Sequence, residues 1–198
     1  RVWAILALSM LVLAACGDDD GDGGGGGGGG GGEEDLVVGI SWNNYAQPRW
    51  AKADGPAIIE AVEAAGGTVI ETDANDSSEQ QLADVDSLIN QGADVLILLA
   101  KDAEAILPAV TRATEAGIPV IGYDRLIEDE NAFYITFNNE QVGTIMAEEI
   151  TAVVPEGNYA IVKGHSADPN ADFLRSGMTP VLDQFPGIEI VCEDYNDD

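Results

Sequence analysis

Short runs of apolar residues alternate with longer stretches of helically spaced apolar residues from residue 36 to the end of the chain. Most of these runs are continuous, which is typical of strands buried on both faces of a sheet. The strands that we expect cover residues 36–41, 68–71, 95–99, 118–122, 133–137, 159–163 and 188–192. Strict alternation of such strands with helices predicts an α/β fold with a doubly wound parallel sheet.

The stretches between the strands predict five helices. They cover residues 50–65, a segment that opens at 77 or 78 and closes near 92, and residues 102–116, 140–153 and 168–184. Pro56 lies inside the first of these helices, so we expect it to kink that helix or to restart it behind Asp54 as a cap. In the fourth helix the apolar residues fall on one side: Val142, Ile145, Met146 and Ile150.

Polar and aromatic side chains follow three of the predicted strands. In a parallel sheet of this kind, ligands bind beside the carboxyl ends of the strands. Carboxylates and amides exchange hydrogen bonds with hydroxyls, arginine donates in a fixed geometry, and an indole packs on an apolar C–H face, so the set suits a neutral sugar. The candidate binding residues are Arg49, Trp50, Asp124, Arg125, Asp168 and Asn170.

Each of these residues also has a purely structural interpretation. Arg125 and Asp124 are neighbours and so are candidates for a surface ion pair at a turn, and Trp50 lies on the apolar face of its helix, where core residues lie. Asn170 follows Pro169 and is a candidate helix cap. Their joint occurrence at the strand ends of one sheet edge favours a binding cleft.

Composition narrows the classes of function. The chain has 198 residues, with 36 acidic and 8 basic side chains and a net charge of −28, which argues against nucleic acid or anionic lipid as partners. Motifs for dinucleotides, nucleotide phosphates and a serine nucleophile are absent, so no cofactor is expected. His165 is the only histidine, which leaves no histidine-rich metal site. Cys192 lies in a predicted strand and is interpreted as a core thiol.

The first 35 residues predict export and anchoring. Residues 1–16 form an apolar signal that ends in Leu13-Ala14-Ala15-Cys16, which resembles the bacterial lipobox, so Cys16 is the expected lipid anchor. The alternative is a simple signal peptide with a chance cysteine. Residues 17–35 are rich in glycine and aspartate and predict a flexible tether that holds the folded part away from the membrane. The expected location is the outer side of the cytoplasmic membrane, in the periplasm or at the cell surface.

Several segments together resemble a known family. They are Val38 to Ser41 with Pro48-Arg49-Trp50, Tyr123 to Ile127, Phe133 to Gly143, and Gly164 to Asn170 with Arg175 and Gly177. The chain is similar to the periplasmic sugar-binding proteins of ABC importers, most of all those that bind D-xylose, from Leu36 to the end. The resemblance implies a type I periplasmic-binding fold whose two domains close over a pyranose.

The resemblance also implies roles for the candidate residues. Arg49, Asp124 and Arg125 of the first domain would bind sugar hydroxyls, and Trp50 would supply a ring face. Asp168 and Asn170 would reach in from the second domain, and Phe137 with Asn138 would form the hinge. The domains expected are 36–137 and 138–198; the second is incomplete, because family members run on by more than a hundred residues, so we expect this chain alone to bind sugar poorly.

The leading hypothesis is a monomeric, lipid-anchored receptor that binds a monosaccharide and delivers it to an ABC permease with its ATPase, without catalysis or a cofactor. Two alternatives stay open. One is a sugar sensor that presents its closed form to a chemoreceptor or a sensor kinase. The other is an exported glycoside-acting enzyme that works through Asp124 or Asp168, for which the sequence contains no matching motif.

Overall fold

The computed structural model describes residues 36–197. The predicted export signal (1–16), the anchor residue Cys16 and the predicted tether (17–35) lie outside the described residues. Among the residues that the structure does describe, no helix is long and apolar enough to cross a membrane.

Five parallel strands form the larger sheet, in the order β2-β1-β3-β4-β5. The chain therefore leaves β1 toward β2 on one side and continues with β3 on the other, which places a topological switch point at β1. The strands are β1 (Val37–Trp42), β2 (Thr68–Asp73), β3 (Val95–Leu98), β4 (Val120–Tyr123) and β5 (Ala132–Ile135). The predicted parallel α/β sheet is confirmed, with strand ends shifted by at most two residues.

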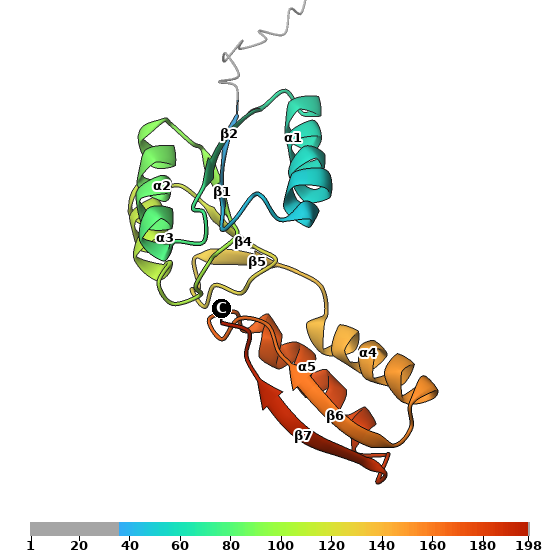
Figure 1. Ribbon diagram of the computed structural model, residues 1–198. Helices are drawn as coiled ribbons and strands as arrows, with labels where there is room; N and C mark the ends of the chain where they lie inside the picture. Colours follow the sequence, from blue (N-terminus) through green and yellow to red (C-terminus); the bar gives the residue numbers. More distant parts are fainter. Residues whose placement is uncertain (1–35, 198) are drawn as a thin grey trace, which may run out of the picture. The chain divides into compact units, whose positions relative to one another are not determined.

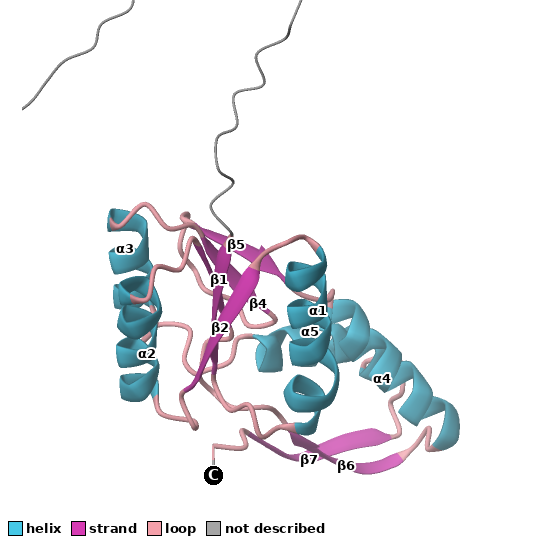
Figure 2. Ribbon diagram, turned by 90° about the horizontal axis from the view of Figure 1, so that it is seen from above, coloured by secondary structure: helices cyan, strands magenta, loops and turns pink. Residues whose placement is uncertain are grey.

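Helices cover both faces of this sheet, as Figures 1 and 2 show. Helix α1 (Gly55–Ala64) lies on one face, over a core that includes Ile40 and Trp42. Helices α2 (Ser78–Asn90) and α3 (Leu107–Glu115) lie on the other face, over a larger core that includes Leu88 and Leu98. Burial on both faces explains why the sequences of the central strands β1 and β3 are continuous apolar runs.

Helix α1 is preceded by a π-helical turn, η1 (Trp50–Asp54), and the chain passes from one into the other with helical backbone angles. The sequence predicted a kink or a restart at Pro56, and the structure resolves the alternatives: the helix continues but widens. Proline has no N–H, and in an α-helix its ring clashes with the carbonyl of the fourth residue before it, here Lys52. A wider turn before Pro56 relieves that clash.

Two parallel strands form a second, smaller sheet. Its elements are α4 (Asn139–Val153), β6 (Gly157–Val162), α5 (Asn170–Leu182) and β7 (Ile188–Asp194), and both helices lie on the same side of the strands (Figures 1 and 2). We call residues 36–137 the first lobe and residues 138–197 the second lobe. All of them belong to one compact unit, so the domain boundary predicted between 137 and 138 stays a prediction.

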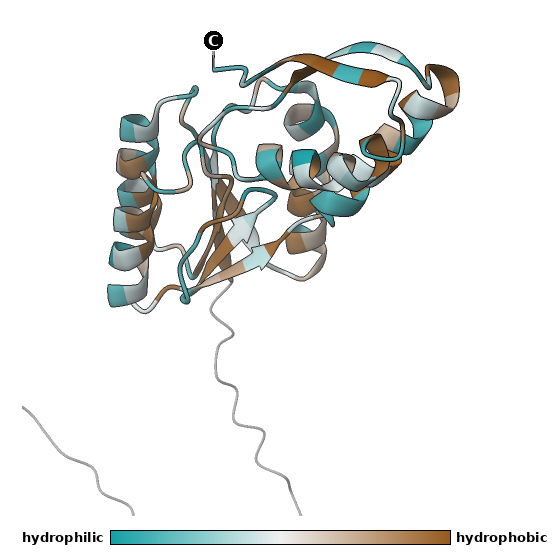
Figure 3. Cartoon of the chain, turned by 90° about the horizontal axis from the view of Figure 1, so that it is seen from below, coloured by the Kyte–Doolittle hydropathy of each residue, from teal (hydrophilic) through white to brown (hydrophobic). Residues whose placement is uncertain are grey.

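Two expectations about local structure were wrong, and one helix has an exposed apolar side. The helix predicted from residue 102 begins at Leu107, because the Asp102 side chain accepts hydrogen bonds from the backbone of Glu104 and Ala105 and holds a turn there. The apolar residues predicted on one side of α4 are exposed, and the buried residues of α4, which packs on α5, are Gly143, Ala147 and Thr151. Cys192 is exposed rather than buried, because none of the helices within residues 36–197 covers the outer face of β6 and β7, whose brown segments are visible near the C-terminal label in Figure 3.

Candidate functional site

The site is built where β1, β4 and β6 end. Asp124 follows β4 directly and has a φ of +64°, a left-handed conformation that aspartate tolerates better than most side chains. Its N–H donates to the Ile135 carbonyl (2.8 Å), and the N–H of Arg125 donates back to the Tyr123 carbonyl (2.7 Å). The chain thus turns sharply, and the side chains of Asp124 and Arg125 enter different interactions.

Arg49 is held by two carboxylates. Its Nη1 lies 2.8 Å from Asp124 Oδ1 and its Nε lies 3.0 Å from Asp54 Oδ2. The guanidinium also lies over two aromatic rings, 4.2 Å from the centroid of Trp50 and 5.4 Å from that of Phe137. Burial alone would lower the pKa of Arg49, but the charges of Asp124 and Asp54 outweigh it and raise the pKa.

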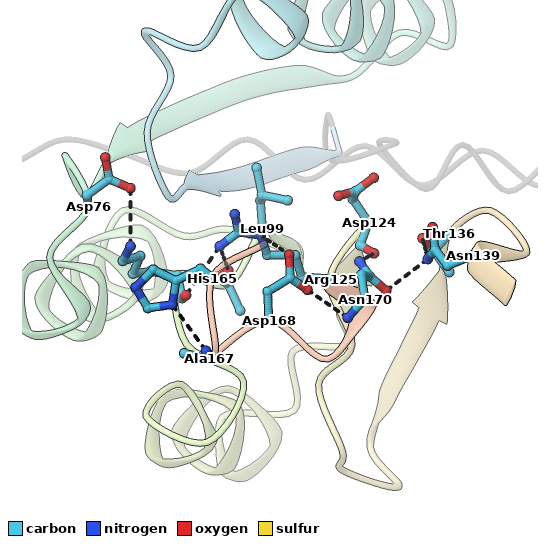
Figure 4. Close-up of polar contacts among 12 residues, drawn as sticks. Asp76, Leu99, Asp124, Arg125, Thr136, Asn139, His165, Ala167, Asp168 and Asn170 are labelled. Atoms are coloured by element: carbon cyan, nitrogen blue, oxygen red, sulfur yellow. Dashed lines mark hydrogen bonds and ion pairs between the residues drawn. The ribbon is translucent and has the colours of Figure 1, made fainter. Parts of the chain in front are cut away.

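Arg125 joins the first lobe to the loop after β6. Its Nη1 donates to the carbonyls of Ala100 (3.1 Å) and Lys101 (3.2 Å), just after β3, and its Nε lies 3.2 Å from Asp168 Oδ2. Burial raises the pKa of Asp168 above its usual range, although the charge of Arg125 acts in the opposite direction. Figure 4 shows Asp168 directed at Arg125 across the two loops.

Asn170 is the centre of a small polar network (Figure 4). Its Nδ2 donates to the Asp124 carbonyl (2.8 Å), and its Oδ1 accepts from Tyr134 (3.1 Å) and Asn139 (2.8 Å). Its backbone N–H donates to the Asp168 carboxylate (3.1 Å). The side chain is almost fully buried and satisfied, and it does not cap α5, so it links the two lobes at this point.

The structure brings five of the six predicted residues together: Arg49, Asp124, Arg125, Asp168 and Asn170. The expectation for Trp50 differs from what is observed. Trp50 is only 4% exposed and packs in the core beneath α1, with Arg49 over its ring, so it offers no free face to a sugar. The position of Trp50 on the apolar face of its helix had already indicated a core residue as the alternative.

The predicted hinge residues lie between the two sheets. The side chain of Asn138 accepts a hydrogen bond from the Gln141 N–H (3.0 Å) and caps α4. Phe137 is 64% exposed, and its ring is the exposed aromatic surface beside Arg49. Whether the chain bends at these residues stays a prediction.

Three residues of the site were missed as site residues. Tyr123 donates its hydroxyl to Asp54 (2.8 Å), and burial together with that hydrogen bond raises the pKa of Tyr123. Tyr134 reaches Asn170, and burial raises its pKa as well. Asp54 was considered only as a helix cap. The position of Tyr123 at a strand end was a usable signal, whereas nothing in the local pattern marks Asp54.

The surroundings of the site contain no cation site. In the part of the chain that the structure describes, no three histidine, cysteine, aspartate or glutamate side chains gather to hold a metal ion. A hollow of about 290 Å³ lies between the loop from Asp102 to Glu104 and residues Ser166, Ala167 and Pro169 of the loop after β6. The site therefore offers arginine N–H groups, carboxylate oxygens and amides, which suit a polar uncharged ligand.

Comparison with known proteins identifies the family of the chain. Residues 38–198 match the periplasmic binding protein domain. The chain belongs to the periplasmic binding protein family. This confirms the family predicted from the sequence and, with the parallel sheet, the predicted fold class.

Two of the similar proteins are named for a sugar that they bind or were solved with. The D-xylose-binding periplasmic protein of Haemophilus influenzae is 36% identical over 151 residues, which are 76% of this chain and 45% of that protein. A carbohydrate transporter solute-binding protein from Chloroflexus aurantiacus, solved with D-glucose, is 31% identical with a TM-score of 0.69 and covers 79% of this chain and 48% of that one.

A third similar protein is the fructose-binding periplasmic domain of a hybrid two-component system. It is 26% identical with a TM-score of 0.73, over 81% of this chain and 54% of that one. The chain spans about half the length of the relatives it matches.

Proposed function

We propose that this protein binds a neutral monosaccharide, an aldose such as D-xylose, as the substrate-binding component of an ABC importer. The observation that carries the proposal is the meeting of two arginine–aspartate pairs, Arg49 with Asp124 and Arg125 with Asp168, at the strand ends of a periplasmic binding protein fold.

The charge balance of these pairs favours an uncharged ligand. Two guanidinium groups face three carboxylates, those of Asp54, Asp124 and Asp168. An anion would add to the negative excess, whereas a sugar hydroxyl both donates to a carboxylate and accepts from an arginine. Arg49 keeps 43% of its side chain exposed and so keeps N–H groups available to a ligand.

The finer parts of the proposal concern partners and location. A protein of this function is exported, works with a permease and its ATPase, and catalyses no reaction. Anchoring through Cys16 is part of the same proposal, and monomeric action is the simplest arrangement for a receptor that delivers one sugar at a time. The named relatives that bind D-xylose and D-glucose support the ligand class.

A titration with sugars tests the ligand class. We expect D-xylose to shift the NMR signals of the Arg49 and Arg125 side chains at millimolar concentrations or below, and Arg125→Ala to abolish the response, because it removes a charged donor and leaves Asp168 unpaired. Arg112→Ala is the matched control, since Arg112 pairs with Asp86 away from the site. Equal responses of wild type and Arg125→Ala, or no response to any aldose, would contradict the proposal.

A second candidate, a sugar sensor, has one specific observation in its favour. The similar fructose-binding domain is named as part of a hybrid two-component system. Capture of the exported protein with a sugar present separates the two candidates: recovery of a permease supports import, and recovery of a chemoreceptor or a sensor kinase supports sensing.

A further inference from the structure

The π-helical turn η1 brings together two residues that an α-helix would separate. Arg49 and Asp54 are five residues apart, which in an α-helix places them about 140° apart around the axis. In the observed turn the Gly55 N–H donates to the Trp50 carbonyl, an i→i+5 bond, and this wider spacing stacks residues five apart. The Arg49 Nε and Asp54 Oδ2 atoms consequently lie 3.0 Å apart.

The sequence after Asp54 supports this geometry at two positions. Pro56 removes an N–H and excludes the ordinary α-helical turn in front of it. At Gly55 a Cβ atom would lie 2.7 Å from the Tyr45 hydroxyl oxygen and 2.9 Å from the Trp50 carbonyl oxygen, so a side chain does not fit there. Gly55 and Pro56 thus fix the turn that carries Asp54.

A single carboxylate oxygen of Asp54 serves two partners. Oδ2 accepts from the Nε of Arg49 (3.0 Å) and from the hydroxyl of Tyr123 (2.8 Å), at the end of β4. The Asp54 side chain is 15% exposed, which leaves water little room to compete. With Nε held by Asp54 and Nη1 by Asp124, Arg49 has two fixed points, and its remaining N–H groups have a defined direction.

We propose that Asp54 is a positioning residue of the sugar site: it holds Arg49 in one orientation and ties it to the end of β4 through Tyr123. The inference rests on the proposed function, because the orientation matters only if Arg49 contacts the ligand. In this proposal Asp54 acts through Arg49 and not by direct contact with the sugar. An arginine with fixed N–H directions distinguishes sugars by the placement of their hydroxyls, so Asp54 influences affinity and selectivity.

The test compares Asp54→Asn with Asp86→Asn, which alters the same kind of pair, Asp86 with Arg112 Nε, on α2 and α3. In the sugar-free protein we expect hydrogen exchange at the Arg49 Nε–H to become roughly fivefold faster in Asp54→Asn, and to stay unchanged in Asp86→Asn. The Tyr123 hydroxyl, followed by its phenolate absorbance with Tyr123→Phe as reference, should ionise at lower pH in Asp54→Asn. The apparent affinity for D-xylose should fall about tenfold in Asp54→Asn alone.

The outcomes separate this inference from the proposed function. Unchanged exchange at Arg49 in Asp54→Asn means that Asp54 does not hold Arg49, and the inference is wrong whatever the sugar result. Faster exchange with an unchanged D-xylose affinity shows that the positioning does not serve binding, and this also overturns the inference. If the wild type responds to no aldose, the proposed function fails, while the exchange measurement still decides whether Asp54 holds Arg49.

Discussion

The two lobes use the same βα alternation but bury their apolar residues to very different extents. In the first lobe, helices cover both faces of the sheet, and side chains such as Val85, Leu96 and Leu98 are fully buried. In the second lobe both helices lie on one face, and the core is limited to Ala147, Val181 and Leu182 with partly buried neighbours. Ten of the fourteen exposed large apolar side chains among the described residues belong to the second lobe, so its framework is the weaker one.

The difference matters because the site draws on both lobes. The first lobe contributes Asp124 and Arg125, which follow β4 of a sheet that is covered by helices on both faces. It also contributes Arg49 and Asp54, which lie at η1 after β1. Asp168 comes from the loop before α5 and Asn170 is the first residue of α5, and the main support of α5 is α4. An apolar hollow of about 270 Å³ remains between α4, β6 and α5. The first lobe therefore presents a preformed half of the site, and the second lobe supplies Asp168 and Asn170 from a less extensively packed core.

The largest expected effect is on the first-lobe core. Leu98→Ala should lower the free energy of unfolding by about 4 kcal/mol, because it leaves a cavity at a position with no exposure. Leu182→Ala, at 9% exposure in the second lobe, should cost about 2 kcal/mol, because the surroundings can close in. Chemical denaturation with amide exchange in each lobe measures both. Equal costs would mean that the two cores are equally packed.

A glycine substitution probes the helix contact of the second lobe. A Cβ at Gly177 would overlap the backbone oxygen of Glu140, and a Cβ at Gly143 would overlap that of Leu174, so α4 and α5 approach through glycines. Gly177→Ala should cost about 3 kcal/mol and remove amide protection in α4 and α5 only. The control is Gly122→Ala in the first lobe, where the nearest side-chain atom would lie 3.4 Å away, and we expect little change there. Retained protection in α4 and α5 would argue against this tight crossing.

The smallest expected effect is a pH dependence from Asp168. Because burial raises the pKa of Asp168 despite the nearby charge of Arg125, the folded state holds this proton more tightly than the unfolded state. Its contribution to stability is complete below the usual aspartate value of 3.8 and is lost as the pH rises through the raised pKa. The free energy of unfolding of the wild type relative to Asp168→Asn should therefore fall across that window and then level off.

Asp172 in the same lobe is the matched control, because its pH dependence of the free energy of unfolding should have the opposite sign. A hydrogen bond from Tyr195 and the charge of Lys163 lower the pKa of Asp172. Its contribution is present above 3.8 and is lost as the pH falls through the lowered pKa. Denaturation of the wild type, Asp168→Asn and Asp172→Asn from about pH 3 to about pH 7 measures both slopes. Slopes of the same sign would contradict the assignment of burial as the dominant cause at Asp168.

Much of the fold follows from local pattern. The apolar run 95–99 became β3, and the serine predicted to open the second helix is Ser77, whose side chain caps α2. These elements were predictable because apolar periodicity and capping act within a few residues. Helix α3 was placed too early because a turn held by Asp102 has the same composition as a helix start.

The candidate site was predictable in its membership and not in its internal contacts. Parallel strands of one sheet end at one edge, so residues after β1 and β4 were expected to meet there, and Arg49 and Asp124 do. Asp168 follows β6, which belongs to the second sheet, so its contact with Arg125 does not follow from a shared sheet edge. Whether an aromatic residue faces the ligand or the core depends on what packs over it, which is why Trp50 was misplaced and Phe137 is the exposed ring.

The sequence by itself determined the alternation of strands and helices, the edge at which polar groups gather and the family, because these depend on short-range pattern and on motifs. Only the tertiary structure decided which carboxylate holds which arginine, which face of α4 stays exposed, and that Asp54 reaches Arg49. Those outcomes depend on contacts between segments far apart in the chain and on one widened helical turn, and a periodic pattern carries no information about either.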